Sequence, residues 1–264
     1  MFDWKLFVLL SAISMPGVVI VVPRLIASLT KKIQPTGKTL PPRSVMILAG
    51  IGQTAGLLFI LAAVGTAVAP TIGFRAPFFE ALLNGGDLWD SFRTQLFPSL
   101  IVGIGGALLF VTAYYKVFRP RLDEQSRTIT ENLRKELGLA GRIFYGGIFE
   151  EVLARWGLLS LIVWLLFKIS ATVTAVTIWI SIVIAGLLFG LGHLPAAIGA
   201  GARATPALIA TALILNLWAS IPFGWLFWQY GLLAAMLGHI AFHLVWYPFE
   251  IHHLTYRFTK THLL

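Results

Sequence analysis

The 264-residue sequence contains no cysteine and few charged side chains, which make up 12% of the chain. Without cysteine there can be no disulfide, thiolate metal site or cysteine nucleophile, so any metal must have nitrogen or oxygen ligands. So few charges cannot cover a soluble globule of this size. Hydrophobic residues make up 58% of the chain, and the mean hydropathy is +0.84. The composition predicts an all-α polytopic membrane protein.

Acidic residues are also scarce, with 11 Asp and Glu against 20 Lys and Arg, for a net charge of +9. A large positive charge can indicate nucleic-acid binding. Here, however, the basic residues gather in particular loops between apolar runs, as the positive-inside rule predicts for membrane proteins. We therefore expect no nucleic-acid partner.

Seven apolar segments meet or approach the length of about 20 residues that crosses a bilayer. No flexible linker, heptad or short-period repeat interrupts them, so we expect one integral membrane domain over residues 1–264. The predicted spans are residues 4–22, 45–69, 97–118, 143–167, 172–191, 206–228 and 232–249.

The charges of the loops predict the orientation of these spans. The loops at 24–43 and 116–142 are rich in Lys and Arg, whereas the loop at 70–96 carries two arginines and three acids. The basic loops should therefore lie in the cytoplasm. Seven spans then place the N-terminus outside and the C-terminus in the cytoplasm, and we expect the membrane to be a bacterial plasma membrane.

Within the third loop, Ile129, Leu133 and Leu137 recur at four-residue spacing between charged positions. This pattern predicts an amphipathic helix, either lying on the cytoplasmic membrane face or connecting two spans in solvent.

Ionisable residues inside membrane spans are costly and often functional. Glu151 and Arg155 lie one helical turn apart and can form an ion pair, which leaves Glu150 on another side of the helix without a cation. His239 and His243 also share a face and can bind one metal ion, with His193 as a third ligand. The candidate residues come from three spans and have matching depths in the cytoplasmic half of the bilayer: Glu150, Glu151, Arg155, His193, His239 and His243.

Carboxylates and histidines at this depth fit metal-assisted peptide hydrolysis, with Glu150 as the general base and zinc as the metal. Each of these candidate residues also has a purely structural explanation, because a Glu–Arg pair or a lone histidine can hold two helices together without any catalytic role. His252, His253 and His262 follow the last span, and we expect them to be tail residues rather than ligands.

Three motifs occur in order along the chain: EExxxR at 150–155, FxxxH at 189–193 and HxxxH at 239–243. Between about 143 and 247 this pattern resembles the CPBP family, which contains CAAX proteases and bacteriocin-processing enzymes and is also called Abi. The resemblance implies a catalytic core at about 143–249. It also implies that Glu150 activates water, that Glu151 and Arg155 support it, and that His193 and His239 position it directly or through a metal. His243 stands where the family commonly has Asn, so its role stays open.

The function expected from this resemblance is an intramembrane metallo- or glutamic endopeptidase. Its substrates would be membrane-attached peptides or proteins, lipidated or not, cut near a C-terminal CAAX-like site or a bacteriocin site. Two alternatives stay open: a transporter with a proton or metal relay, and a catalytically silent immunity protein. Proton or metal flux in liposomes would distinguish the transporter.

Overall fold

The computed structural model describes residues 2–33 and 40–261, with side chains over 2–30 and 40–252. This part of the chain is helical and contains no strand. The α-helices are α1 (Trp4–Ile33), α2 (Arg43–Val68), α3 (Pro77–Asn84), α4 (Leu88–Ala113), α5 (Glu124–Gly141), α6 (Ser160–Ser170), α7 (Ala175–Gly199), α8 (Pro206–Tyr230) and α9 (Leu232–Thr261).

Among the described residues, seven helical segments are long and apolar enough to cross a membrane, which confirms the predicted fold class. The chain is an integral multi-pass membrane protein. Side chains such as Ile101 and Ile169 lie exposed on the outer faces of these helices, where lipid would cover them. The segments are Trp4–Thr30, Arg43–Ile72, Leu88–Arg121, Glu124–Ser170, Ala175–Gly199, Pro206–Tyr230 and Leu232–His252.

Several helices are longer than their apolar cores, so some predicted boundaries were wrong. Helix α1 continues to Ile33, and α4 begins at Leu88 rather than at residue 97. The start of α4 is fixed by Asp87, whose carboxylate accepts a hydrogen bond from the Asp90 N–H at 2.9 Å. Residues 34–39 of the first predicted loop, Lys38 among them, lie outside the described residues.

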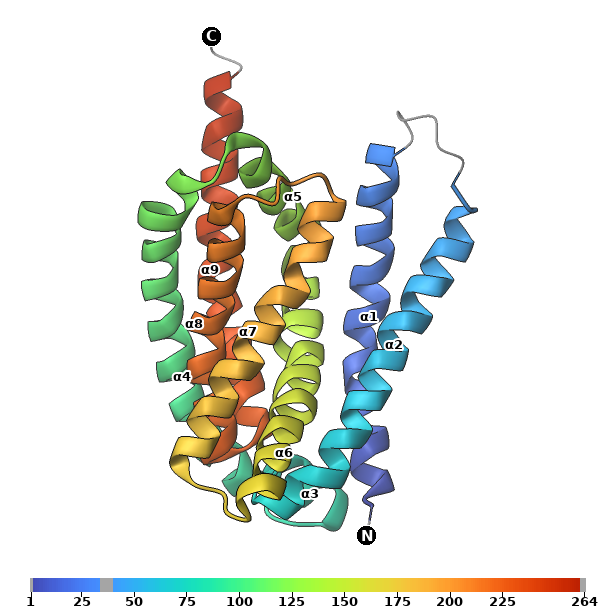
Figure 1. The fold of residues 1–264 in the computed structure, drawn as a ribbon, viewed down its shortest axis with the longest axis vertical. Helices are drawn as coiled ribbons and strands as arrows, with labels where there is room; N and C mark the ends of the chain where they lie inside the picture. Colours follow the sequence, from blue (N-terminus) through green and yellow to red (C-terminus); the bar gives the residue numbers. More distant parts are fainter. Residues whose placement is uncertain (1, 34–39, 262–264) are drawn as a thin grey trace.

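Helix α5 confirms the helix predicted in the third loop, but its apolar side packs against protein. Ile129 lies in a small buried cluster with Leu194 of α7 and Leu208 of α8. The Ser126 hydroxyl accepts a hydrogen bond from the Arg203 N–H at 3.0 Å, in the connection between those two helices. Helix α5 therefore covers one end of the bundle (Figure 1).

Asp123 caps the first turn of α5. Its carboxylate accepts a hydrogen bond from the Ser126 N–H at 2.9 Å, and this bond to the backbone lowers the pKa of Asp123.

Close helix packing depends on glycine at several positions, because a residue without a side chain lets two helices approach closely. Gly157 packs against Leu61 of α2, and Gly238 of α9 packs against the side chain of Leu226 in α8. Gly192 is an exception, because no atom of a neighbouring element lies within 4 Å of the position that a Cβ would take. Helices α4 and α9 lie side by side in the bundle, and α7 runs obliquely beside α8 (Figure 1).

Candidate active site

Glu150 and Glu151 lie between two π-helical segments, η5 (Arg142–Phe149) and η6 (Val152–Leu159), which join α5 to α6. Wide π-helical turns are rare and are frequently found at functional sites. The two neighbouring carboxylates differ in exposure: the side chain of Glu151 is fully buried, whereas that of Glu150 is 16% exposed and lines a cavity.

The predicted ion pair between Glu151 and Arg155 is present, with 3.1 Å between the Glu151 Oε1 and Arg155 Nη1 atoms. The same carboxylate oxygen accepts a hydrogen bond from His239 Nδ1 at 2.6 Å, a contact that the spacing of the sequence did not predict. Because Nδ1 donates the hydrogen in this bond, Nε2 is the nitrogen of His239 that is left to contact other groups.

Arg155 also connects this cluster to α8. Its Nη2 lies 3.4 Å from the Ala219 carbonyl oxygen and 3.5 Å from the Ser220 hydroxyl. The guanidinium group lies near the rings of Phe189 and Phe223, at 5.8 and 5.7 Å from their centroids. The ion pair is therefore enclosed by aromatic and backbone partners that hold its position.

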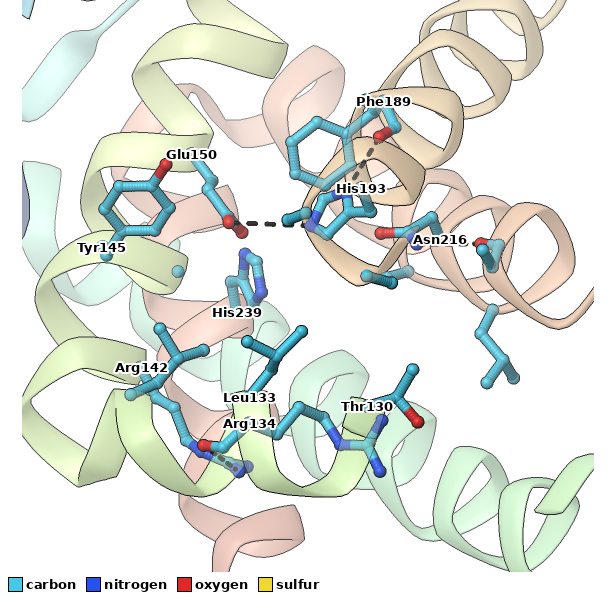
Figure 2. A pocket seen from close by; sticks show the side chains of 18 of the residues that line it. Thr130, Leu133, Arg134, Arg142, Tyr145, Glu150, Phe189, His193, Asn216 and His239 are labelled. Carbon is cyan, nitrogen blue, oxygen red and sulfur yellow. Dashed lines mark hydrogen bonds and ion pairs between the residues drawn. The ribbon is translucent and has the colours of Figure 1, made fainter. Parts of the chain in front are cut away.

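His193 faces Glu150 across the edge of the cavity. The Nε2 atom of His193 lies 3.8 Å from Glu150 Oε1, while its Nδ1 donates a hydrogen bond to the Phe189 carbonyl at 2.8 Å (Figure 2). This bond fixes the tautomer and directs the Nε2 lone pair toward the carboxylate. The FxxxH motif thus supplies both the histidine and the carbonyl that orients it.

His239 and His243 stack on one face of α9, with ring centroids 4.7 Å apart. Figure 2 shows the His239 ring pointing toward Glu150. His243 fits beside Gly146, where an added Cβ would lie only 2.6 Å from its Nε2 atom. The buried Nδ1 atom of His243 has no hydrogen-bond partner. The absence of a side chain at Gly146 therefore makes the space for His243.

One cavity of about 520 Å³ brings five of the six predicted side chains together. Glu151 is not in its wall and reaches it through His239. Most of the other lining residues are apolar. Four residues of the whole lining come from α5, so the cavity lies toward the end of the bundle that α5 covers. The five residues in the wall are Glu150, Arg155, His193, His239 and His243.

The described residues do not form a ready metal site. No group of three His, Cys, Asp or Glu side chains among them is arranged to hold one metal ion. The Nδ1 atoms of His193 and His239 are bound to the Phe189 carbonyl and to Glu151, so each ring has only its Nε2 atom open. The predicted set of three histidine ligands does not fit this arrangement, and zinc stays a prediction.

A family comparison covers all six predicted residues. Residues 136–245 match the family model described as type II CAAX prenyl endopeptidase Rce1-like. The match confirms the resemblance expected from the three motifs, and the family is one of proteases. No curated protein and no solved structure matches the chain.

Two arginines at the cavity have a position that was not predicted from the sequence. Arg134 and Arg142 were counted as charges of a cytoplasmic loop, but both line the cavity and both contact Glu250. One signal was available, because Glu250 is the only acidic residue after Glu151. A lone acid at the end of an apolar span needs basic partners.

Among the histidines beyond the seventh predicted span, only His252 has a described side chain. The side chain of His252 is exposed, and His252 does not line the cavity. The side chains of His253 and His262 lie outside the described residues.

Proposed function

We propose that the protein is an intramembrane endopeptidase that hydrolyses a peptide bond near the C-terminus of membrane-attached substrates, with Glu150 as the general base. The observation that carries this proposal is the 3.8 Å separation between Glu150 Oε1 and His193 Nε2. This gap is too long for a direct hydrogen bond and suits a bridging water.

Both atoms beside the gap are hydrogen-bond acceptors when Glu150 is ionised and His193 carries its proton on Nδ1. A water between them donates one hydrogen to each and keeps a lone pair free for the substrate carbonyl carbon. As the water oxygen attacks, Glu150 takes its proton. When the C–N bond breaks, Glu150 returns that proton to the leaving amine, so the carboxylate is regenerated.

His239 suits the stabilisation of negative charge on the substrate carbonyl oxygen. Its ring faces Glu150 in the same cavity, and the hydrogen bond from Nδ1 to Glu151 holds the ring in that orientation. An imidazole that also carries a proton on Nε2 can donate a hydrogen bond to the oxyanion. Glu151 and Arg155 act in this proposal as positioning residues, because they hold the ring of His239 rather than touching the substrate.

The walls of the cavity favour an apolar substrate segment. Leucine and phenylalanine side chains make up much of the lining, and about 520 Å³ is within the range of pockets that enclose a small ligand or a few residues. We propose that the substrate is a peptide or protein attached to the bilayer, lipidated on a cysteine near its C-terminus or processed as a bacteriocin precursor. On the predicted topology, cleavage takes place in the cytoplasmic half of the membrane.

Cleavage of a quenched-fluorescence peptide library, with lipidated and unlipidated members, tests this function. The purified protein in detergent should cleave at least one member, and Glu150→Gln should reduce the rate by about 100-fold or more, since general base catalysis contributes about that much. Thermal unfolding of the variant checks that its fold is intact. If Glu150→Gln cleaves peptides at the wild-type rate, Glu150 is not the general base. Loss of activity on adding a chelator, with recovery on adding zinc, would support a metal mechanism over one based on glutamate alone.

A further inference from the structure

A second cluster of buried charges lies in the same cavity, away from the three motifs. Glu250 of α9 accepts a hydrogen bond from Arg134 Nε at 2.6 Å and another from Arg142 Nη2. One carboxylate therefore faces two guanidinium groups, and arginine stays charged in proteins. Nearby Glu131 does not balance the excess, because it pairs with Arg119 at 2.6 Å. The cluster has one uncompensated positive charge.

The positive side of this cluster faces the cavity. Arg134 and Arg142 are both lining residues, whereas Glu250 lies behind them and does not line the cavity. Figure 2 shows the two arginines at one side of the pocket and Glu150 with His193 at the other. The cavity thus has a catalytic end and a cationic end.

Arg142 has unused hydrogen-bond donors. Its side chain is only 2% exposed, yet its Nε and Nη1 atoms are buried without a hydrogen-bond partner. Buried donors without an acceptor destabilise a protein, so their presence at a cavity points to a ligand that supplies the acceptor. An anion fits both the excess charge and the free donors.

We propose that Arg134 and Arg142 bind the C-terminal carboxylate of the substrate, and this inference rests on the proposed peptidase function. A carboxylate is the planar anion that guanidinium groups bind through paired hydrogen bonds. The arginines lie across the cavity from Glu150 and His193, so they select substrates whose chain ends within the cavity, beyond the cleaved bond.

Two peptides that differ only at the C-terminus, one a free acid and the other an amide, test the proposal. Wild type should cleave the acid with a kcat/KM about 10- to 100-fold higher, the effect of a hydrogen bond to a charged group. Arg134→Gln and Arg142→Gln should each remove this preference by raising KM for the acid much more than for the amide. Each variant leaves Glu250 paired with the other arginine.

Lys135→Gln is the matched control, because Lys135 is the next residue of α5, is exposed and does not line the cavity. This variant should keep the preference for the acid. Equal cleavage of acid and amide by wild type would overturn the proposal. An equal loss on both peptides in the arginine variants would also overturn it, since a purely structural role would act in that way.

A binding measurement separates this inference from the peptidase function. If no peptide is cleaved, calorimetric titration of wild type with an apolar tripeptide acid and its amide still tests the arginines. The acid should bind at least 10-fold more tightly, and only when Arg134 is present. Equal binding would overturn the inference. Thermal stabilisation by phosphatidylglycerol nanodiscs without tripeptide binding would also overturn it, in favour of a lipid phosphate site.

Discussion

Two buried carboxylates each hold two basic side chains, and their partners differ in kind. Glu151 binds Arg155 and His239, whereas Glu250 binds Arg134 and Arg142. An imidazole can gain or lose a proton near neutral pH, but a guanidinium group cannot. The cluster around Glu151 can therefore change its charge during a reaction, and the cluster around Glu250 carries a permanent excess of positive charge.

This difference indicates that the two ends of the cavity have different roles. The end with Glu150, His193 and His239 is suited to moving protons, and the end with Arg134 and Arg142 is suited to holding an anion. Replacing the central carboxylate of each cluster should separate the two roles.

The largest effect is expected for Glu151→Ala. This change leaves Arg155 buried without its counterion and should reduce the free energy of unfolding by about 3–5 kcal/mol. It also removes the acceptor that orients His239, so kcat in the folded fraction should fall by about 10- to 100-fold. Thermal unfolding in detergent and peptide cleavage measure the two effects. An unchanged melting temperature would show that the pair does not stabilise the fold.

Glu250→Ala is the matched change at the cationic end. It should destabilise the fold by a similar 3–5 kcal/mol, because two buried arginines lose their counterion. At a temperature where the variant is folded, however, kcat should be retained and KM for a free-acid peptide should fall, since the positive charge facing the cavity increases. A loss of kcat as large as that of Glu151→Ala would contradict the division between the two ends.

Gly146→Ala tests the packing that holds His243 in the cavity. The added methyl group would lie 2.6 Å from the present position of His243 Nε2, so the ring must move. Overpacking of this kind should cost about 1–3 kcal/mol of unfolding free energy and lower activity. Gly192→Ala is the control, because its Cβ would meet no neighbouring element, and it should be neutral or slightly stabilising. Equal melting temperatures for the two variants would show that the site can absorb the methyl group.

The smallest effect is expected for His243→Asn, which introduces the residue that the resembled family commonly has. The space beside Gly146 that His243 now fills also accommodates the smaller Asn side chain, and the Nδ1 atom of His243 makes no hydrogen bond that would be lost. Peptide cleavage should stay within about threefold of wild type, less than 1 kcal/mol in barrier height. Complete loss of cleavage would assign His243 a role of its own.

Hydropathy and motif spacing predicted much of the fold and the candidate site. The seven spans and the helix at 124–141 could be predicted because lipid and helical periodicity constrain composition over many residues. The pair of Glu151 with Arg155 could be predicted because both residues lie on one helix, where spacing determines proximity. The close packing of Gly157 and the open surroundings of Gly192 could not be distinguished from the sequence, because a glycine in a helix does not reveal whether a neighbour approaches it.

The sequence by itself determined the membrane class, the number of spans and the three motifs, because these depend on local composition and on spacing within single helices. Only the tertiary structure decided that His239 binds Glu151, that His193 faces Glu150, and that Arg134 and Arg142 share Glu250 at the cavity. Each of these contacts joins separate helical segments, and contacts of this kind depend on how helices rotate and pack against one another. The sequence alone does not distinguish a charged residue in an exposed loop from one in a buried cluster, because the partners of a charged residue depend on tertiary packing.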